Sequence, residues 1–244
     1  MSKKFEHKWV EIPRLKQINT PNGRRYEVNG EVAYPSITTV LGKTKDNRAL
    51  FEWRKRVGEE TANKISRNAT TRGTSMHKLC ERYLRNEPVD APKPTPAQDL
   101  EFAEINDGDW TAGQLMFSGI RPLLDRVDNV RCLETGLFSH ILGVAGTVDC
   151  IAEYDGRLAV VDFKTSRRPK KKDNIEDYFM QGAFYFTAFH EITGELPRQI
   201  AILVSVQDGS NQEFIVEGRE IIQWTEQLKK RIEDYNNVVN TTAD

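Results

Sequence analysis

The chain has 244 residues, of which 38% are hydrophobic and 29% are charged, and its formal net charge is −1. This length and apolar content suit one large domain with a core of its own. The near-zero net charge excludes a protein that is basic throughout, so contacts with nucleic acid must come from local basic patches.

Membrane and export signals are not found in the sequence. No apolar run reaches the ~20 residues of a membrane span. The first residues lack the apolar segment of a signal peptide and carry acidic residues that a transit peptide avoids. Cys80, Cys132 and Cys150 are odd in number and lack metal-ligand spacing, which is typical of reduced thiols. We expect a cytoplasmic protein that does not bind membranes.

Residues 1–34 are polar and broken by turn signals, and we treat them as an N-terminal extension. In the next stretch, 35–41, Ser36 is placed to cap a short helix. The free N–H groups at that helix start, together with the hydroxyls of Ser36 and Thr38, could instead hold a phosphate. Helix capping and phosphate binding are therefore both open for these residues.

A helix is predicted over residues 49–66, where apolar residues recur at helical spacing. Arg54 lies in a basic run on the other side of this helix. A run of charges usually faces solvent, but this one is also a candidate contact for a nucleic-acid backbone. Residues 70–75 are expected to form a loop that contains Arg72.

A helix over residues 76–85 follows this loop and carries His77. A single histidine on a helix is more often structural than catalytic, so His77 is a candidate ligand only in combination with other motifs. Glu81 lies one turn further along the same face and is expected to support His77.

Residues 88–96 are rich in proline and form the clearest internal boundary of the chain. A second helical stretch, 111–127, contains Pro122, which should kink or split it. Residues 130–137 resemble a strand that carries Glu134, and the simplest interpretation of Glu134 is a solvated strand residue.

Residues 146–166 contain two β-rich runs on either side of Asp155-Gly156, the dipeptide that most strongly signals a two-residue hairpin turn. Pairing outward from this tip sets Asp149 directly across from Asp162, with both side chains on one face. Lys164 lies two residues beyond Asp162 and projects from the same face. The hairpin thus predicts two carboxylates and an ammonium group together at its open end.

Two directly opposed carboxylates cost roughly 0.2–1 kcal/mol, so we expect a positive partner between them. Lys164 could supply it as an ordinary ion pair. A divalent cation fits better, because hard oxygen ligands suit Mg²⁺. A metal beside a lysine is suited to phosphodiester hydrolysis, since the metal lowers the pKa of its bound water while the lysine orients the nucleophile.

Residues 167–172 are expected to attract phosphates at this end of the sheet, although a solvated loop is the alternative. Five of these six residues are basic: Arg167, Arg168, Lys170, Lys171 and Lys172. The next helix, predicted over 178–192, is rich in aromatic residues. Gln181 and Tyr185 are one turn apart on it, so both can point toward the active-site face.

The last part of the chain predicts a strand buried on both faces over 199–206, an edge strand over 213–216 and an amphipathic helix over 220–235. We therefore expect an α/β fold with a mixed central β-sheet flanked by helices. We divide the chain into the extension 1–34, a helical lobe over 35–128 that lies above the active site, and a core over 129–244, all within one integrated domain.

The motifs, taken in order, resemble the PD-(D/E)xK nuclease superfamily and its RecB-like branch. The resemblance rests on Asp149, on Asp162-Phe163-Lys164, on the helix motif Gly73–His77 and on the motif Gln181–Tyr185. The stretches Pro35–Thr38, Gly143–Gly146, Asp162–Ser166 and Trp224–Tyr235 look like the mitochondrial genome maintenance exonuclease family. The similarity runs from about Pro35 to Tyr235.

This resemblance implies a restriction-endonuclease-like core and a metal-dependent deoxyribonuclease. The expected activity is that of an exonuclease on single-stranded DNA with a free end, in DNA replication, repair or recombination. Flaps or RNA are other possible substrates, and replication or recombination proteins are possible partners. A structure-specific endonuclease on the same core, or an inactive nucleic-acid-binding module, are the alternatives.

The resemblance also implies roles for single residues. His77, Asp149, Asp162 and the carbonyl of Phe163 would hold Mg²⁺ or Mn²⁺, and Glu134 would be an additional acidic group near the metal. Lys164 would orient the attacking water, with Gln181 and Tyr185 positioning the lysine or the strand. Phosphate binding is favoured over capping for the 35–38 stretch. Three cysteines cannot supply the four-cysteine iron–sulfur cluster of some relatives, so no such cluster is expected.

Overall fold

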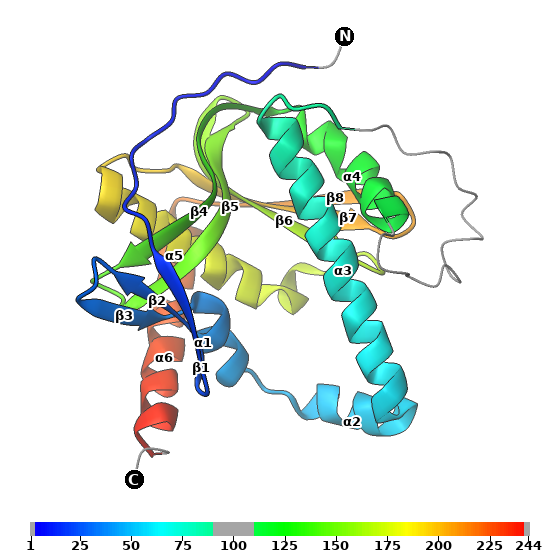
Figure 1. Cartoon of the computed structure of the whole chain (residues 1–244), viewed down its shortest axis with the longest axis vertical. Helices are drawn as coiled ribbons and strands as arrows, with labels where there is room; N and C mark the ends of the chain where they lie inside the picture. Colours follow the sequence, from blue (N-terminus) through cyan, green and yellow to red (C-terminus); the bar gives the residue numbers. More distant parts are fainter. Residues whose placement is uncertain (1–2, 90–109, 242–244) are drawn as a thin grey trace.

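A five-stranded mixed sheet with helices on both faces forms the centre of the protein (Figure 1). The computed structural model describes residues 3–89 and 110–241. The strand order is β4-β5-β6-β7-β8, with β6 and β7 parallel and the other neighbouring pairs antiparallel. The strands are β4 (Val127–Ser139), β5 (Val144–Tyr154), β6 (Arg157–Ser166), β7 (Gln199–Val206) and β8 (Asn211–Glu217). This arrangement confirms the predicted α/β fold with a mixed central sheet.

Helices cover both faces of this sheet. α5 (Glu176–Thr193) and α6 (Arg219–Thr241) pack over one face, while α3 (Glu59–Leu84) and α4 (Trp110–Leu124) pack over the other. β7 is buried along its whole length because it lies between both helical layers. This burial explains its near-continuous apolar sequence. β8 is an edge strand, as expected.

The β5–β6 hairpin has the predicted turn. Asp155 and Gly156 have φ angles of 50° and 73°, and a positive φ at both positions is what a two-residue type I′ turn requires. From this tip the predicted register is observed, running from the pair Tyr154↔Arg157 to the pair Cys150↔Val161.

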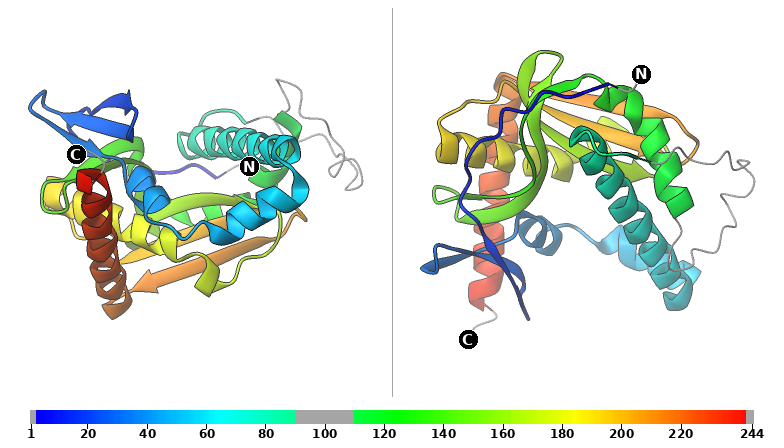
Figure 2. Two further views of the ribbon diagram at one scale, coloured as in Figure 1. Left: turned by 90° about the horizontal axis from the view of Figure 1, so that it is seen from below. Right: turned by 45° about the horizontal axis from the view of Figure 1, so that its top comes forward.

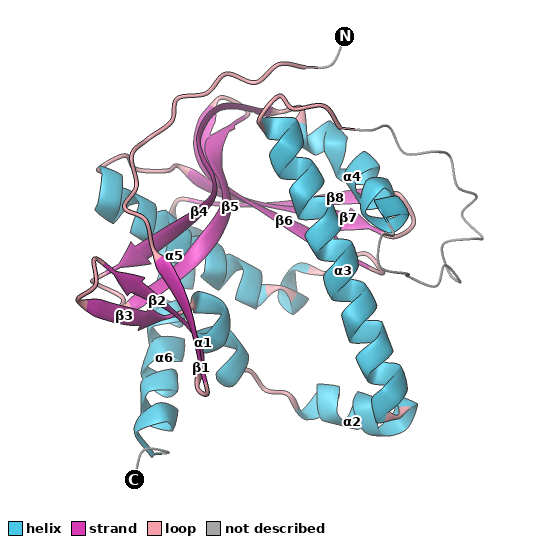
Figure 3. Cartoon of the chain, viewed as in Figure 1, coloured by secondary structure: helices cyan, strands magenta, loops and turns pink. Residues whose placement is uncertain are grey.

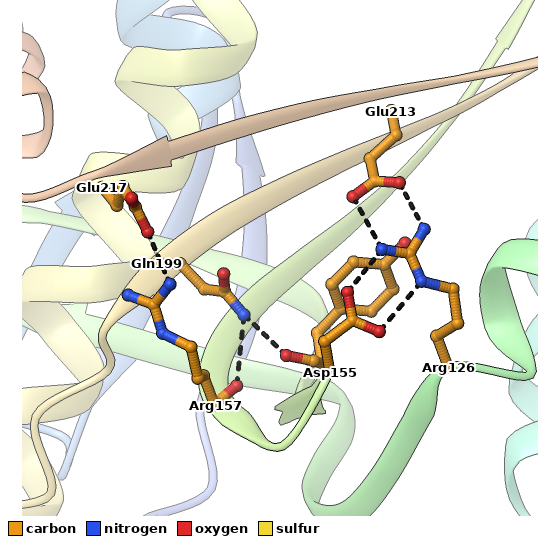
Figure 4. Close-up of polar contacts among 7 residues, drawn as sticks. Arg126, Asp155, Arg157, Gln199, Glu213 and Glu217 are labelled. Atoms are coloured by element: carbon orange, nitrogen blue, oxygen red, sulfur yellow. Dashed lines mark hydrogen bonds and ion pairs between the residues drawn. The ribbon is translucent and has the colours of Figure 1, made fainter.

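Arg126 fixes the tip of this hairpin to the edge of the sheet (Figure 4). Its guanidinium forms ion pairs with Asp155 in the turn and with Glu213 on β8. Gln199 on β7 donates a hydrogen bond to the main-chain carbonyl of Tyr154 at 2.7 Å. The tip is therefore tied to two neighbouring strands, at the end of the hairpin remote from Asp149 and Asp162.

α3 is longer than the sequence predicts. Residues 70–75, expected as a loop, lie inside this helix of 26 residues. The Thr70 hydroxyl donates to the carbonyl of Ser66 at 3.0 Å, so its polar group is satisfied within the helix. α3 also packs very closely on α4, where a Cβ added at Gly113 would lie 2.3 Å from Ser75 Cβ. This packing outweighs the low helix propensity of a run rich in threonine and glycine.

Two further helix predictions need correction. The helix expected over 49–66 is interrupted at Gly58, whose φ is 86°, which leaves α2 (Arg48–Val57) as a separate helix with no buried residue. Figures 1 and 2 show α2 extending away from both sheets. Pro122 does not split α4, which continues through this residue to Leu124. Of the proline-rich segment, residues 90–96 lie outside the described residues.

The N-terminal residues are attached to the main sheet. Lys8 N donates to Val130 O at 2.8 Å, and Val130 N donates to Glu6 O at 2.9 Å. The next residues along the chain form a second, three-stranded sheet, which lies beside β4 and β5 (Figure 3). Its strands are β1 (Lys16–Thr20), β2 (Gly23–Val28) and β3 (Val32–Pro35), and the short helices α1 (Ile37–Lys43) and η2 (Lys172–Asn174) complete the elements. The division of the chain at residues 34 and 128 stays a prediction.

Within the two described ranges, the helices are too short or too polar to cross a bilayer.

Candidate active site

Three side chains from different elements form a group that could hold a metal ion. They are His77 on α3, Glu134 on β4 and Asp149 on β5, with ligand atoms that all lie within 4.8 Å of one another. The Nδ1 atom of His77 lies 3.3 Å from Asp149 Oδ1 and 4.0 Å from Glu134 Oε1. In an octahedral site with bonds of about 2.1 Å, neighbouring and opposite ligands lie ~3.0 and ~4.2 Å apart. The observed separations therefore suit such an ion.

The backbone of Glu134 is unusual in a way that bears on this group. Its neighbours Leu133 and Thr135 pair with Cys150 and Val148, so Glu134 lies opposite Asp149. Its φ is 45°, a left-handed conformation that costs a side-chain-bearing residue roughly 1–2 kcal/mol. Burial first, and then the charge of Asp149, raise the pKa of Glu134 to about 7. Strain and repulsion at one carboxylate are typical of a binding site.

The position of Asp149 corrects one expectation. Asp149 and Asp162 are not partners in the ladder, because the β5–β6 pairing ends one step earlier, at Cys150↔Val161. Instead, Asp149 Oδ2 accepts the main-chain N–H of Phe163 at 2.7 Å. The N–H and C=O of one strand residue point to the same side. The Phe163 carbonyl therefore also faces β5.

His77 and Asp149 form an ion pair in which each changes the pKa of the other. Burial opposes the charge of the imidazolium, but the carboxylate outweighs it, so the pKa of His77 is raised. Burial likewise opposes the charge of Asp149, and His77 outweighs it, so the pKa of Asp149 is lowered. A metal bound by this pair would compete with the proton on His77.

Asp162 and Lys164 form a second charged pair, on the β6 side of the site. Lys164 Nζ lies 2.5 Å from Asp162 Oδ2, so the ordinary ion pair considered as an alternative to a metal is present. Asp162 is only 1% exposed. Apart from that ion pair, its two buried oxygens have no hydrogen-bond partner among the described residues.

The balance between burial and the opposite charge differs between Asp162 and Lys164. Burial raises the pKa of Asp162 to about 6; Lys164 opposes this shift and Asp149 adds to it. Burial also disfavours the ammonium of Lys164, but Asp162 and Asp149 outweigh it and raise its pKa. The oxygens of Asp162 are almost fully enclosed, so burial outweighs the lysine at this carboxylate. An enclosed carboxylate with unused lone pairs suits a cation.

A chain of hydrogen bonds connects Lys164 to the strand that carries Asp149. Lys164 Nζ donates to Gln181 Oε1 at 3.2 Å, and Gln181 Nε2 donates to Tyr185 Oη at 3.3 Å. The Tyr185 hydroxyl then donates to Thr147 O at 2.5 Å. Gly146 leaves room for this arrangement, since a Cβ there would lie 2.9 Å from Ile37 Cγ2 and 3.1 Å from Tyr185 Oη. The structure thus brings both predicted α5 residues to the site.

A model of the PD-(D/E)XK nuclease superfamily matches residues 47–243. The chain belongs to the PD-(D/E)XK nuclease superfamily. The resemblance noted from the ordered motifs is thereby confirmed at the level of the superfamily.

The curated relatives with similar sequences are named mitochondrial genome maintenance exonuclease 1. The Homo sapiens protein is 27% identical over 217 residues, covering 82% of this chain and 58% of that protein. The Mus musculus protein is 28% identical over 186 residues, covering 72% and 51% respectively. The chain thus spans about half the length of these relatives. A solved structure from Eubacterium rectale, 13% identical, has a TM-score of 0.45 and covers 71% of this chain and 68% of its own.

Among the basic residues predicted to contact DNA in this nuclease, Arg72 and Arg167 are brought near each other. Burial first, and then the charge of Arg167, lower the pKa of Arg72. The Arg72 Nε atom is buried and has no hydrogen-bond partner among the described residues. Two neighbouring guanidinium groups, one with an unused donor, suit a phosphate.

Of the other basic residues predicted to contact nucleic acid, some are paired with acidic groups and others are exposed. Arg54 on α2 is bound by Glu59 and Asn63 at the start of α3. Lys172 pairs with Glu220 at 2.6 Å. Arg168 and Lys171 are exposed, while Lys170 is half-buried.

At the start of α1, Ser36 occupies the N-cap position. Ser36 is buried, and its Oγ accepts the N–H of Thr39 at 3.0 Å, which is helix capping. Thr38 is exposed. A phosphate contact of either hydroxyl stays a prediction.

Two contributors to the site could not be found from the sequence. Lys164 Nζ lies 5.1 Å from the centre of the Tyr178 ring, a cation–π contact that holds the ammonium from one side. Gly113 allows α3 to approach α4 next to His77. The predicted helix over 178–192 begins at Tyr178, but nothing in the sequence distinguished that residue or Gly113.

Proposed function

We propose that the protein is a metal-dependent exonuclease that degrades single-stranded DNA from a free end, in DNA replication, repair or recombination. The superfamily supports a nuclease, and the name of the relatives supports DNA maintenance and exonuclease activity. The main supporting observation is the convergence of His77, Glu134 and Asp149 beside the Asp162–Lys164 pair.

The residues present fit a divalent ion, because the enclosed oxygens of Asp162 lack hydrogen-bond partners and the three grouped donors have suitable spacing. His77, Glu134, Asp149, Asp162 and the Phe163 carbonyl would hold Mg²⁺ or Mn²⁺. When bound, the ion would lower the pKa of a water and screen the phosphate charge.

The chain's own side chains would then orient the reactants. Lys164 would turn its ammonium from Asp162 toward the attacking water and donate a hydrogen bond to it. Gln181 would hold the lysine at the required position, and Tyr185 would hold Gln181 through its bond to Thr147 O. Preorganised donors of this kind stabilise the charge that develops on the phosphate in the transition state.

A requirement for a free end is supported by the course of α3, which crosses over β6 in Figure 1 and packs against it. Arg72 lies on α3 and Arg167 directly follows β6, and the charge of Arg167 lowers the pKa of Arg72, so the crossing carries two basic groups near each other. A flexible single strand can enter where α3 crosses β6, whereas a duplex ~20 Å across would have to open first.

The test is a time course on end-labelled linear single-stranded DNA and on a covalently closed circle of the same sequence, at low salt. We expect progressive shortening of the linear strand with Mg²⁺ or Mn²⁺, no cleavage with a chelator, and an intact circle. Equal rates on both substrates would indicate a structure-specific endonuclease instead. Binding of both strands without cleavage under any metal condition would indicate an inactive binding module.

A further inference from the structure

A cavity of about 390 Å³ lies directly beside the candidate metal site. One wall is formed by Ile12–Leu15 and Gln17 of the N-terminal segment and by Tyr26 of β2, and the other by residues of β4 and β5. Glu134 belongs to this second wall and also to the group with His77 and Asp149. The cavity and the candidate metal site therefore share a carboxylate.

The N-terminal wall is built into the fold. Leu15 packs on Gly136 so closely that a Cβ at Gly136 would lie 3.0 Å from Leu15 Cδ1. The chain just before this wall follows β4, with Val10 N donating to Arg131 O at 3.1 Å. The wall lies outside residues 47–243, the part that matches the nuclease superfamily.

The wall combines apolar surface with unused donors. Ile12 and Leu15 supply aliphatic surface, and Tyr26 supplies an aromatic ring. The guanidinium of Arg14 and the side-chain amide of Gln17 have no hydrogen-bond or ion-pair partner within the described part of the chain. Ligand sites commonly combine an apolar lining with a few polar groups of this kind, in volumes of ~300–1,000 Å³.

We propose that this cavity binds one nucleotide of the DNA strand, next to the phosphodiester that is cleaved. The proposal rests on the proposed function and names a subsite for its substrate. A base has flat apolar faces for Ile12 and Leu15 and a hydrogen-bonding edge for Gln17. Its phosphate suits the guanidinium of Arg14, which binds phosphate oxygens in a bidentate manner.

The charges around the cavity orient this nucleotide. Glu134 repels a phosphate unless a cation lies between them, so the phosphate at that side must be the one held at the metal site. The phosphate on the other side of the sugar then lies toward Arg14, with the base in the cavity between them. One nucleotide thus connects the N-terminal wall to the reacting bond.

The binding test uses deoxyadenosine 5′-monophosphate as the probe, titrated calorimetrically into the full chain. We expect saturable binding that Arg14→Ala weakens about tenfold or more, as expected for a lost charge-assisted hydrogen bond. The matched control is Lys16→Ala. This substitution removes the same charge from the same segment. Lys16 itself does not line the cavity, and its Nζ lies 3.8 Å from Glu27 Oε2. Gln17→Ala should weaken binding less than Arg14→Ala.

The second measurement is the KM for a short single-stranded DNA. Arg14→Ala and the cavity-filling Leu15→Trp should raise KM about tenfold with kcat little changed, because neither residue contacts the reacting atoms. Thermal unfolding identifies any variant that fails to fold, and Gln17→Ala then carries the test, since its side chain is exposed.

Two outcomes would overturn the proposal: no binding of the probe by the unmodified chain, or equal affinity and KM in Arg14→Ala and Lys16→Ala. Because the titration needs no cleavage, it separates this inference from the proposed function. A chain that binds the probe but cuts no DNA refutes the nuclease activity alone. A chain that cuts DNA but is insensitive to Arg14 refutes the cavity alone.

Discussion

At the scale of single residues, Asp162 is under two opposing demands. Its enclosure disfavours its charge, yet Lys164 beside it needs a negative partner. Burying an ion pair is stabilising only when the remaining lone pairs are satisfied, and here they are not. The pair is therefore better explained by chemistry than by stability.

Lys164→Ala should lower turnover on linear single-stranded DNA by about a hundredfold or more, because one transition-state donor is lost. Affinity for the strand, measured in Ca²⁺, should change little. Lys229→Ala is a suitable control, since Lys229 is an exposed lysine paired with Glu226 on α6. Normal cleavage by Lys164→Ala would remove this lysine from the mechanism.

Asp149→Asn should abolish Mn²⁺ binding measured by calorimetric titration, and Asp162→Asn should do the same. Mn²⁺ should also raise the melting temperature of the unmodified chain, because it offsets the repulsion among Glu134, Asp149 and Asp162. Glu226→Gln removes an acidic group far from these residues along the chain and should leave both effects intact. Unchanged titration in Asp162→Asn would exclude that residue as a ligand.

At the scale of elements, the contact between α3 and α4 determines where His77 lies. Gly113 contacts Ser75, two residues before His77, so closely that no side chain at position 113 would fit between the helices. Closely packed interiors have little free volume, so a shift of α3 at this contact would be transmitted to His77. The position of the candidate ligand His77 is thus linked to a glycine in a helix that carries no predicted site residue.

Gly113→Val should destabilise the protein by about 1–3 kcal/mol through overpacking. It should also lower turnover, by up to about a hundredfold for a displacement of His77 near 1 Å. Thermal unfolding and steady-state kinetics measure the two effects separately. Gly42→Ala is the control, since α1 leaves open space at Gly42. Equal activity in both variants would show that α3 does not position the histidine through this contact.

At the scale of the whole molecule, the net charge of −1 hides an uneven distribution of basic groups. Some arginines are neutralised locally, as Arg54 is by Glu59, while Arg72 has an unused donor and lies within the influence of the charge of Arg167. Composition cannot distinguish these two cases. The structure can, because it shows which charges already have partners.

Arg72→Ala should reduce the salt dependence of single-strand affinity by about 0.7 in the slope of log K against log salt, the value for one phosphate contact. Arg54→Ala should leave the slope unchanged, because its guanidinium is already occupied by Glu59 and Asn63. Fluorescence anisotropy over a range of salt concentrations measures both slopes. Identical slopes in the two variants would show that Arg72 does not contact a phosphate.

The sequence predicted those features that depend on local patterns. The Asp155-Gly156 turn and the buried run of β7 follow from dihedral preferences and burial, so both were found. The continuous course of α3 through residues 70–75 was missed, because packing against α4 outweighs the local signals. The cavity beside Glu134 was not visible either, since its walls come from segments far apart in the chain. The roles of the candidate site residues stay predictions.

The β5–β6 hairpin is pinned at one end and unpaired at the other, and this has a mechanical consequence. Arg126 and Gln199 hold its tip, while its ladder stops before Asp149. β6 stays paired to β7 as far as Ser166, so it acts as a fixed arm. β5 is paired with β4 as far as Val144 and acts as the second arm. Beyond the last ladder pair, side chains join the two arms: Asp149 Oδ2 accepts the Phe163 N–H, and the chain from Lys164 through Gln181 and Tyr185 reaches Thr147 O. These side-chain contacts, and not the ladder, therefore set the spacing of the carboxylates.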